Sequence, residues 1–458
     1  MECGFDKKHE PKCCLGFRHV QAFLLFFAFV LCFAMTVNMS IAIVVMTDPA
    51  QTDSFDWNIQ KQGVILSSFF WGYLFLQVPA GELANRFGGK NLTMLCVSIN
   101  AIASLCLPMS AYYGGWQMVC TCRVIQGLFQ GFLMPAAHNL LAKWAPLEEK
   151  SRMGAFVYAG AQFGTALQLM TGGIVADYWG WSAIFYVNGA FGAVWTVVYS
   201  LLGSNSPEES KIINGHERDY IQSSLGHVGG HQKRKTPWKS IATSLPFLSV
   251  VVAHCGFKWG YWALLTGIPT YMHKVFGMNI KANGLLSALP YLTLYLLSFP
   301  FGFLSDEIIN RKWLRITTSR KCFNTIGYFG PAAVLIALAH VSAGNVTLAI
   351  TLLTLALGIN AAFYSGYILG SLDMAPNFAG TLMGISNTVA SVMAILAPLM
   401  NGVILKDETD ILEWRYLFYL SAAVYVVTNV FYVIFGSSER QHWNEPRELN
   451  NQKAPECG

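Results

Sequence analysis

The stretch QVPAGELANRFGGK, residues 77–90, follows a long apolar run and interrupts it with a glycine-marked turn that carries two basic residues. The stretch SFPFGFLSDEIINRK, residues 298–312, is a loose second copy of it. Gly302 of the second copy follows Gly81 of the first by 221 positions, which is close to half of the 458 residues. A repeat of this length predicts a chain built from two similar halves.

The composition indicates a membrane protein. Hydrophobic residues make up 54% of the chain and charged residues only 12%, whereas a soluble domain averages about 25% charged residues. A helical membrane span needs about 20 mostly apolar residues. Twelve runs in the sequence are long enough, and they predict an all-α membrane protein with twelve transmembrane helices in two pseudo-symmetric halves of six. The runs lie near residues 20–46, 63–84, 91–112, 116–142, 153–177, 181–203, 243–273, 284–305, 322–341, 346–372, 379–405 and 415–436.

Polar segments divide the chain into five predicted parts. The N-terminal tail has no small-residue cleavage site of a signal peptide, so we expect the first span to be retained. With both tails inside, the cytoplasmic segments hold 23 of the 30 lysines and arginines, which sets the orientation by the positive-inside rule. The net charge of +5 therefore reflects membrane topology and not nucleic-acid binding. The parts are a cytoplasmic tail (1–19), an N-terminal half (20–203), a cytoplasmic linker (204–242), a C-terminal half (243–436) and a second cytoplasmic tail (437–458).

Two cationic side chains fall in the middle of predicted spans, Arg123 in the fourth and Lys258 in the seventh. An ionisable group inside a membrane is energetically unfavourable and marks a functional site by default. The guanidinium of Arg123 is a planar fork suited to phosphate or carboxylate, and Lys258 supplies a compact positive charge. If both face the centre of the fold, one from each half, they would converge on an anion. The alternative is a structural role, such as binding backbone carbonyls between helices.

Acidic residues are missing from the interior of the spans, since the nearest carboxylates lie at the membrane edge. A carrier of organic cations or a proton-driven exporter usually needs a buried carboxylate, so the pattern favours anions. Polar side chains in the spans are candidates for lining the same cavity, with packing between helices as the alternative. The further substrate-binding candidates are Asn38, Tyr73 and Gln130 in the first half and Tyr295 and Asn387 in the second.

The repeated loop resembles that of the major facilitator superfamily, which has the form G-x-L-A-D-R-x-G-x-K between helices two and three. Here residues 81–90 read GELANRFGGK, with Asn85 in place of the usual aspartate. The resemblance implies that this loop and its second copy control closure on the cytoplasmic side. Glycines permit the tight turn, and the basic residues can cap a helix C-terminus; a solvated loop is the alternative. The predicted gating residues are Gly81, Arg86, Gly88 and Lys90, with Asp306 and Arg311 as a charge pair in the second copy.

Motifs along nearly the whole chain narrow the resemblance to the anion:cation symporter family, which includes type I sodium/phosphate cotransporters, sialin and the vesicular glutamate transporters. KWAP at residues 143–146, LDMAP at 372–376 and MGISNT at 383–388 carry this resemblance. The overall pattern is most similar to the insect inorganic phosphate cotransporters.

Three positions depart from the family pattern. Thr36 stands where members commonly carry an arginine, so one expected anion contact is absent. Gln130 stands where sialin-like and glutamate-transporting members have a glutamate linked to proton coupling, and here it resembles the phosphate type. The span-seven arginine of the glutamate transporters aligns near Phe257, beside Lys258.

The resemblance implies secondary active transport of an anion by alternating access, with sodium-dependent cotransport of inorganic phosphate favoured. Two alternatives stay open: a transporter of organic anions such as sialate, urate or acidic amino acids, and a non-transporting membrane receptor that kept the fold. An enzyme is not predicted, because the chain has no nucleophile and base pair, phosphate-binding loop or metal cluster. Eleven cysteines, an odd number, predict no disulfide framework.

Sodium is the expected co-substrate, and no cofactor or bound metal is predicted. Sodium would have to use hydroxyls, amides and backbone carbonyls, such as those near Asn38 or Asn387. We expect a monomer in the plasma membrane, with a vesicular or lysosomal membrane as the alternative. Asn345 begins the glycosylation pattern Asn-Val-Thr in an outer connection, but it lies so near the membrane that we do not expect modification.

Overall fold

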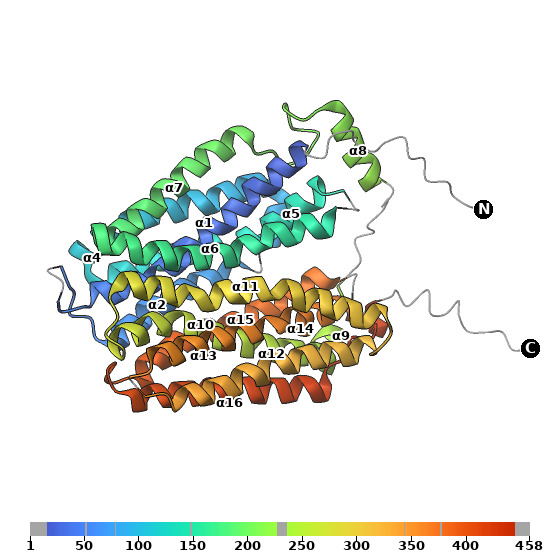
Figure 1. The fold of residues 1–458 in the computed structure, drawn as a ribbon. Coiled ribbons are helices and arrows are strands. Elements are labelled where there is room, and N and C mark those ends of the chain that lie inside the picture. The colour runs from blue at the N-terminus through green and yellow to red at the C-terminus, as the bar shows by residue number, and fades with distance from the viewer. Residues whose placement is uncertain are drawn as a thin grey trace, which may run out of the picture. The chain divides into compact units, whose positions relative to one another are not determined.

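The computed structural model describes residues 16–50, 53–77, 79–146, 149–226, 236–342, 344–375 and 378–444. Every regular element in these ranges is helical. Most of the two predicted tails, residues 1–15 and 445–458, lie outside the described residues. Figure 1 shows the helices coloured along the chain from blue to red.

The helices fall into two sets along the chain. The first set is α1 (Phe17–Met46), α2 (Ile59–Gln77), α3 (Ala80–Phe87), α4 (Gly89–Gln130), α5 (Leu133–Trp144), α6 (Lys150–Trp179), α7 (Trp181–Leu202) and α8 (Gly215–Gly226). The second set is α9 (Trp238–Ala242), α10 (Leu245–Lys274), α11 (Ile280–Asn310), α12 (Ile316–Ala339), α13 (Val346–Asn360), η2 (Ala361–Ser365), α14 (Tyr367–Met374), α15 (Ala379–Ile404), α16 (Ile411–Phe435) and η4 (His442–Asn444).

Each of the predicted membrane runs overlaps helix in the described part of the chain. Eight helical segments of the described chain are long and apolar enough to cross a membrane by length and composition. One of them, residues 89–144, covers two predicted runs, and α4 is divided between them at Gly115, whose backbone has φ +62° and ψ −162°. The three remaining runs form α2, α6 and α10. The non-helical backbone at Gly115 marks the connection between the third and fourth predicted spans. Glycine adopts this positive φ without strain.

The chain forms two compact units. Unit 1 comprises the described parts of Met1–Asn38, Trp71–Gln168 and Ser182–Arg234, and unit 2 comprises those of Met39–Phe70, Leu169–Trp181 and Lys235–Gly458. In unit 2, α10 packs against α15 and α16, and α12 packs against α13 and α16.

Close helix packing in unit 1 depends on two glycines of α6. A Cβ atom added to Gly160 would lie 2.6 Å from the Phe26 carbonyl oxygen, and one added to Gly164 would lie 2.4 Å from the Val30 carbonyl oxygen. Real Cβ atoms do not approach oxygen this closely. The Gly-x-x-x-Gly spacing therefore allows the backbones of α6 and α1 to meet, which is the packing role that small residues have in membrane helices.

The polar segment between the two predicted halves contains a helix that the sequence pattern does not reveal. α8 packs on the apolar core of unit 1 through the fully buried Ile221, with Tyr220 and Leu225 partly buried beside it. Its first turn carries Glu217, which accepts hydrogen bonds from the backbone N–H groups of Phe17 (2.8 Å) and Arg18 (3.1 Å) at the start of α1. A carboxylate at a helix N-terminus satisfies donors that have no partner within the helix.

Candidate functional site

Arg123 lies in α4 of unit 1 and is only 2% exposed. Its guanidinium donates hydrogen bonds to two backbone carbonyls of α1, from Nη2 to Thr36 O (3.0 Å) and from Nη1 to Met35 O (3.4 Å). Arg123 therefore binds backbone carbonyls of a neighbouring helix, which was the alternative to anion binding in the sequence-based prediction. Carbonyl oxygens are neutral acceptors, so they leave the positive charge of the guanidinium in place.

Thr36 and Gln130, the two family departures in unit 1, contact each other. The Gln130 side-chain amide donates to Thr36 Oγ1 (2.9 Å), and Thr36 Oγ1 lies 3.1 Å from Gln130 Oε1 and 2.8 Å from the Cys32 carbonyl oxygen to which it donates. Both side chains are buried. The two positions at which the family resemblance implies charged residues thus hold a neutral hydrogen-bonded pair, and Arg123 contacts the backbone carbonyl of Thr36.

Asn38 follows on the same helix and is completely buried. Neither atom of its side-chain amide has a hydrogen-bond partner among the described residues. Buried amides are normally satisfied, and the exceptions call for a ligand, a water or another functional explanation. Asn38 therefore stays a substrate-binding candidate, with the capacity to donate and to accept.

Lys258 lies near the middle of α10 in unit 2 and is partly exposed. Its ammonium forms no hydrogen bond or ion pair with any residue in the described ranges. One turn earlier, the buried His254 lies 2.8 Å (Nδ1) from Ser386 Oγ on α15, and its ring contacts Tyr367 at a centroid distance of 5.3 Å. His254 and Lys258 share a helix face because they are four residues apart. Lys258 was predicted as a binding residue from the sequence, whereas His254, four residues earlier in the same apolar run, was not.

The other predicted binding residues make local contacts. Tyr73 accepts a hydrogen bond at its hydroxyl from Gln77 Nε2 (3.2 Å), one helical turn away. Tyr295 packs edge-on against Phe299 with a ring-centroid distance of 5.2 Å. Asn387 is partly buried next to Ser386 on α15. None of these contacts tests a role in substrate binding, so the three residues remain candidates.

The predicted cytoplasmic loop of unit 1 is mostly helical. Gly81 and Arg86 belong to α3, and the chain turns at Gly88, where φ is +83°. Lys90 behaves as the sequence leads us to expect, because its ammonium donates to the Ser200 carbonyl oxygen (3.2 Å) in the last turns of α7. A lysine at this place satisfies a helix C-terminus and complements its dipole.

The second copy differs from the prediction. α11 continues through Gly302 to Asn310, so the chain turns only at Lys312, where φ is +57°. Arg311 pairs with Glu307 one turn earlier (Nε to Oε1, 2.5 Å) and not with Asp306, which is exposed. Positions four apart lie on one face of a helix, whereas Asp306 and Arg311 are five apart and lie on different faces.

The buried charge pair at this end of unit 2 is a different one. Arg320 of α12 donates from Nε to Asp373 Oδ2 (2.9 Å) and from Nη1 to Ser305 Oγ (3.0 Å). The arginine is 6% exposed. The pair joins α12, α14 and α11, and sequence reasoning missed it because the partners are 53 residues apart.

A second charged cluster lies in unit 1. Arg18, 2% exposed, donates to Glu149 through Nε (2.7 Å) and Nη2 (2.9 Å) and to Glu217 through Nη1 (3.0 Å). The bidentate hydrogen bonds from Arg18 hold the pKa of Glu149 below its ordinary value. This cluster links the start of α1, the segment before α6 and α8.

Comparison with known families agrees with these features. A model of the family described as Major Facilitator Superfamily matches residues 24–398. The chain belongs to the Major Facilitator Superfamily. The crystal structure of a bacterial homolog to the human lysosomal transporter Spinster matches this facilitator with a TM-score of 0.72 over 91% of this chain and 96% of that chain. At 14% sequence identity, this similarity concerns the fold alone.

Curated relatives of this facilitator support the narrower resemblance. A "Putative inorganic phosphate cotransporter" of Drosophila melanogaster is 37% identical, covering 98% of this chain and 90% of the relative. Sialin of Ovis aries is 35% identical, covering 94% of this chain and 92% of the relative. The predicted facilitator fold and the resemblance to these transporters are confirmed. The chain is therefore a multi-pass membrane transporter and not an enzyme.

Proposed function

We propose that this facilitator is a secondary active transporter of small anions, with inorganic phosphate as its first substrate and sodium as the co-ion. The observation that carries the proposal is Lys258. Its ammonium lies in the middle of α10, partly exposed, and no described residue neutralises it. A charge that the protein leaves uncompensated at this depth favours the binding of a counter-charged ligand.

Arg123 supports the same proposal in unit 1. Two of its hydrogen-bond acceptors, the Met35 and Thr36 carbonyl oxygens, are neutral, and an anion would be a stronger acceptor for its planar fork than they are. The absence of carboxylates from the interior of the predicted spans makes a cationic substrate a poor fit.

The names of the relatives favour phosphate. The insect relative is named as an inorganic phosphate cotransporter and is 37% identical. The similarity to sialin, at 35%, supports a second candidate, an organic anion that presents a carboxylate to the same cations. Thr36 and Gln130 form a neutral pair, which favours a co-ion other than the proton in unit 1.

We further propose that the transporter acts as a monomer in the plasma membrane. Surface biotinylation of cells that express the full chain tests the location, and light scattering of the purified protein tests the oligomeric state. Labelling confined to an intracellular membrane would favour a vesicular or lysosomal role.

The substrate is tested by uptake of radiolabelled phosphate into proteoliposomes that hold the purified full chain. Inward gradients of sodium and potassium are compared at two pH values, and sialate, urate and glutamate are offered as competitors. Sodium-stimulated phosphate uptake that these organic anions leave unchanged supports the first candidate. Displacement by one of them supports the organic-anion candidate, and ligand binding without any flux would point to a receptor.

A further inference from the structure

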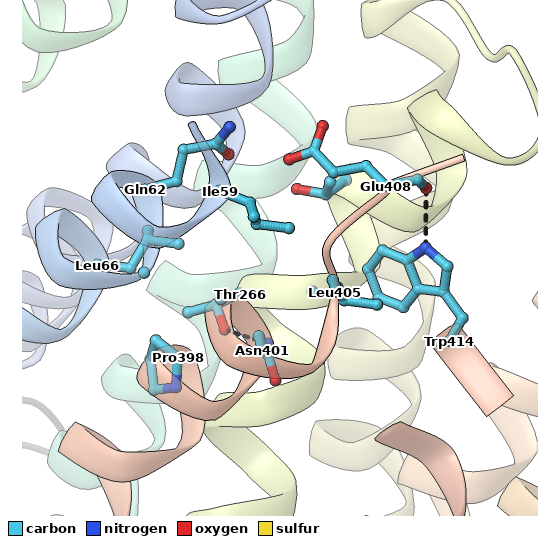
Figure 2. A pocket seen from close by; sticks show the side chains of 13 residues that line it. Ile59, Gln62, Leu66, Thr266, Pro398, Asn401, Leu405, Glu408 and Trp414 are labelled. Atoms are coloured by element: carbon cyan, nitrogen blue, oxygen red, sulfur yellow. Dashed lines mark hydrogen bonds between the residues drawn. The ribbon is translucent and has the colours of Figure 1, made fainter. Parts of the chain in front are cut away.

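A small pocket lies entirely within unit 2, at the end where α2 and α16 begin and α10 and α15 finish (Figure 2). The positive-inside rule predicts that this end faces outside. The empty space of the pocket is about 300 Å³, part of it open to solvent. Its polar lining residues are Gln62 of α2, Thr266 and Thr270 of α10, Asn401 of α15 and Glu408 of the following loop.

Most of the hydrogen-bond donors around this pocket already have partners. Gln62 Nε2 donates to the Trp57 carbonyl oxygen (3.1 Å). Asn401 Nδ2 donates to the Ala263 carbonyl oxygen (3.2 Å) and to Thr266 Oγ1 (3.3 Å), a contact drawn in Figure 2. The Ala263 carbonyl and the Thr266 hydroxyl both act as acceptors here, so the nitrogen of the Asn401 amide must face them and its oxygen must point the other way.

Two further donors are also committed. Thr266 Oγ1 donates to the Trp262 carbonyl oxygen (2.7 Å), and Trp414 Nε1 donates to the Glu408 carbonyl oxygen (2.9 Å). The pocket thus has few donors to offer a ligand. Its chemistry is set by the acceptor oxygens that remain.

One of those oxygens, Oε1 of Glu408, is buried and has no hydrogen-bond partner among the described residues. The side-chain oxygen of the buried Asn401 also has no partner there, but Figure 2 shows it directed away from the Glu408 carboxylate, so the two oxygens do not share an occupant. An unsatisfied buried acceptor is energetically unfavourable and calls for an occupant that supplies positive charge or a proton. Gln62 Oε1 and Thr270 Oγ1 add two further oxygens on the lining.

Glu408 gives the pocket its only formal negative charge, and its other oxygen has a competitor. Lys274 Nζ lies 3.6 Å from Glu408 Oε2, with the two side chains 19% and 15% exposed. At this distance the contact is an ion pair without a close hydrogen bond. It leaves Oε1 available and neutralises the carboxylate only in part.

We propose that Gln62, Thr270 and Glu408 form a binding site for a small monovalent cation, with sodium as the ion. Amide, hydroxyl and carboxylate oxygens are the ligands that hard cations prefer. The single carboxylate of Glu408 matches a single positive charge, which favours a monovalent ion. The described residues contain no group of three or more histidine, cysteine, aspartate or glutamate side chains that could hold a metal ion of higher charge. Its role in transport rests on the sodium coupling proposed above, whereas binding is tested without phosphate.

This assignment differs from the expectation that a sodium ion would be held near Asn38 or Asn387. The outer pocket supplies a carboxylate, which neither of those regions contains. Bound sodium would replace Lys274 as the counter-charge of Glu408. The ion and the lysine therefore compete, and this competition gives the proposal a test in both directions.

The test measures thermal unfolding of the purified full-length protein as sodium chloride replaces choline chloride at constant ionic strength, without phosphate. Wild type is expected to gain stability with a saturable sodium dependence. Glu408→Gln should raise the sodium concentration at half-effect on the order of tenfold or more, since it removes the only formal charge. Thr270→Val, an isosteric change, should raise it by a smaller factor, and Lys274→Gln should lower it.

Asp56→Asn is the matched control, because Asp56 is an exposed carboxylate just before α2 that does not line the pocket. It should respond to sodium as wild type does. An equal response to sodium and choline in wild type, or an unchanged half-effect concentration in Glu408→Gln, would overturn the site and leave the pocket to water. If Glu408→Gln does not fold, the test rests on Lys274→Gln. A sodium concentration at half-effect in Lys274→Gln that equals or exceeds that of wild type contradicts the proposal.

The two proposals fail separately. Sodium-dependent stabilisation that depends on Glu408, without any phosphate uptake, would keep the cation site and reject phosphate transport. Sodium-driven phosphate uptake with a sodium dependence indifferent to Glu408 and Lys274 would keep the transport function and reject this site.

Discussion

Arg18 and Glu149, 131 residues apart in the chain, form a two-pronged ion pair in which the guanidinium donates to both carboxylate oxygens at 2.7 and 2.9 Å. Fork-to-fork geometry of this kind is stronger and more specific than a single contact. Because Arg18 also binds Glu217, the pair ties the first helix of unit 1 to α8. The predicted linker therefore contains a segment that is part of unit 1 and not a free tether.

The pair predicts acid sensitivity of unit 1. The hydrogen bonds from Arg18 keep the pKa of Glu149 below its ordinary value, so the carboxylate stabilises the fold above its unfolded pKa of about 4.3. This contribution is lost as the pH falls through the lower, folded pKa. Thermal unfolding measured from neutral to acidic pH should show a steeper acid loss in wild type than in Glu149→Gln. Parallel profiles would show that the pair does not contribute.

Glu217 should anchor α8. Glu217→Gln removes the charge that accepts from the Phe17 and Arg18 backbone and from the Arg18 guanidinium, and should lower the free energy of unfolding by about 2 kcal/mol. Hydrogen exchange should rise in residues 215–226. Glu208→Gln is the control, since Glu208 binds only the exposed Gln222. Equal exchange in both variants would contradict the anchoring role.

Gly164 should tolerate no side chain. In Gly164→Ala the new Cβ would press on the Val30 carbonyl oxygen of α1, at 2.4 Å before relaxation, and should destabilise the protein by about 1–3 kcal/mol. Gly154→Ala on the same helix is the control, because its Cβ would meet only Tyr158 at 3.9 Å. The thermal midpoints of the two variants give the comparison. A Gly164→Ala midpoint no lower than that of Gly154→Ala would show that α1 and α6 can separate freely.

Gln130 should keep the charge near Arg123 independent of pH. Gln130→Glu replaces the amide that binds Thr36 with a group that can ionise, and the ionised form should repel an anion. Phosphate uptake by the variant, taken relative to wild type at each pH, should therefore rise as the pH is lowered from about 8 to 5. Using wild type as the reference removes the titration of phosphate itself. A constant ratio would mean that position 130 is electrostatically remote from the substrate.

Much of the fold follows from the length and apolar character of the runs, since each of them forms helix. What could not be predicted depends on contacts between distant residues. α8 was missed because a polar segment that buries Ile221 shows no apolar periodicity, and Arg18 was counted among the tail charges because its partners lie far along the chain. Arg311 was assigned to Asp306 because a helix continuing to Asn310 was not expected there.

The candidate site was predicted in its residues and less well in its contacts. Arg123 and Lys258 were found because a charge in an apolar run is conspicuous, yet the carbonyl partners of Arg123 depend on backbone positions that composition does not report. The Thr36–Gln130 hydrogen bond was not predicted, because the two residues that depart from the family pattern lie far apart in the sequence and nothing there shows that they contact each other. The outer pocket was missed because its oxygens come from three helices and a loop, and none is unusual alone.

The most direct test of the central claim is phosphate uptake by Lys258→Gln in proteoliposomes, measured beside Lys406→Gln, which removes an exposed lysine from an outer loop. If the uncompensated charge on α10 binds the transported anion, Lys258→Gln should lose roughly tenfold or more of wild-type kcat/KM. Lys406→Gln should retain it. Wild-type uptake by Lys258→Gln would contradict the account, because the mid-span lysine would then have no part in holding the substrate.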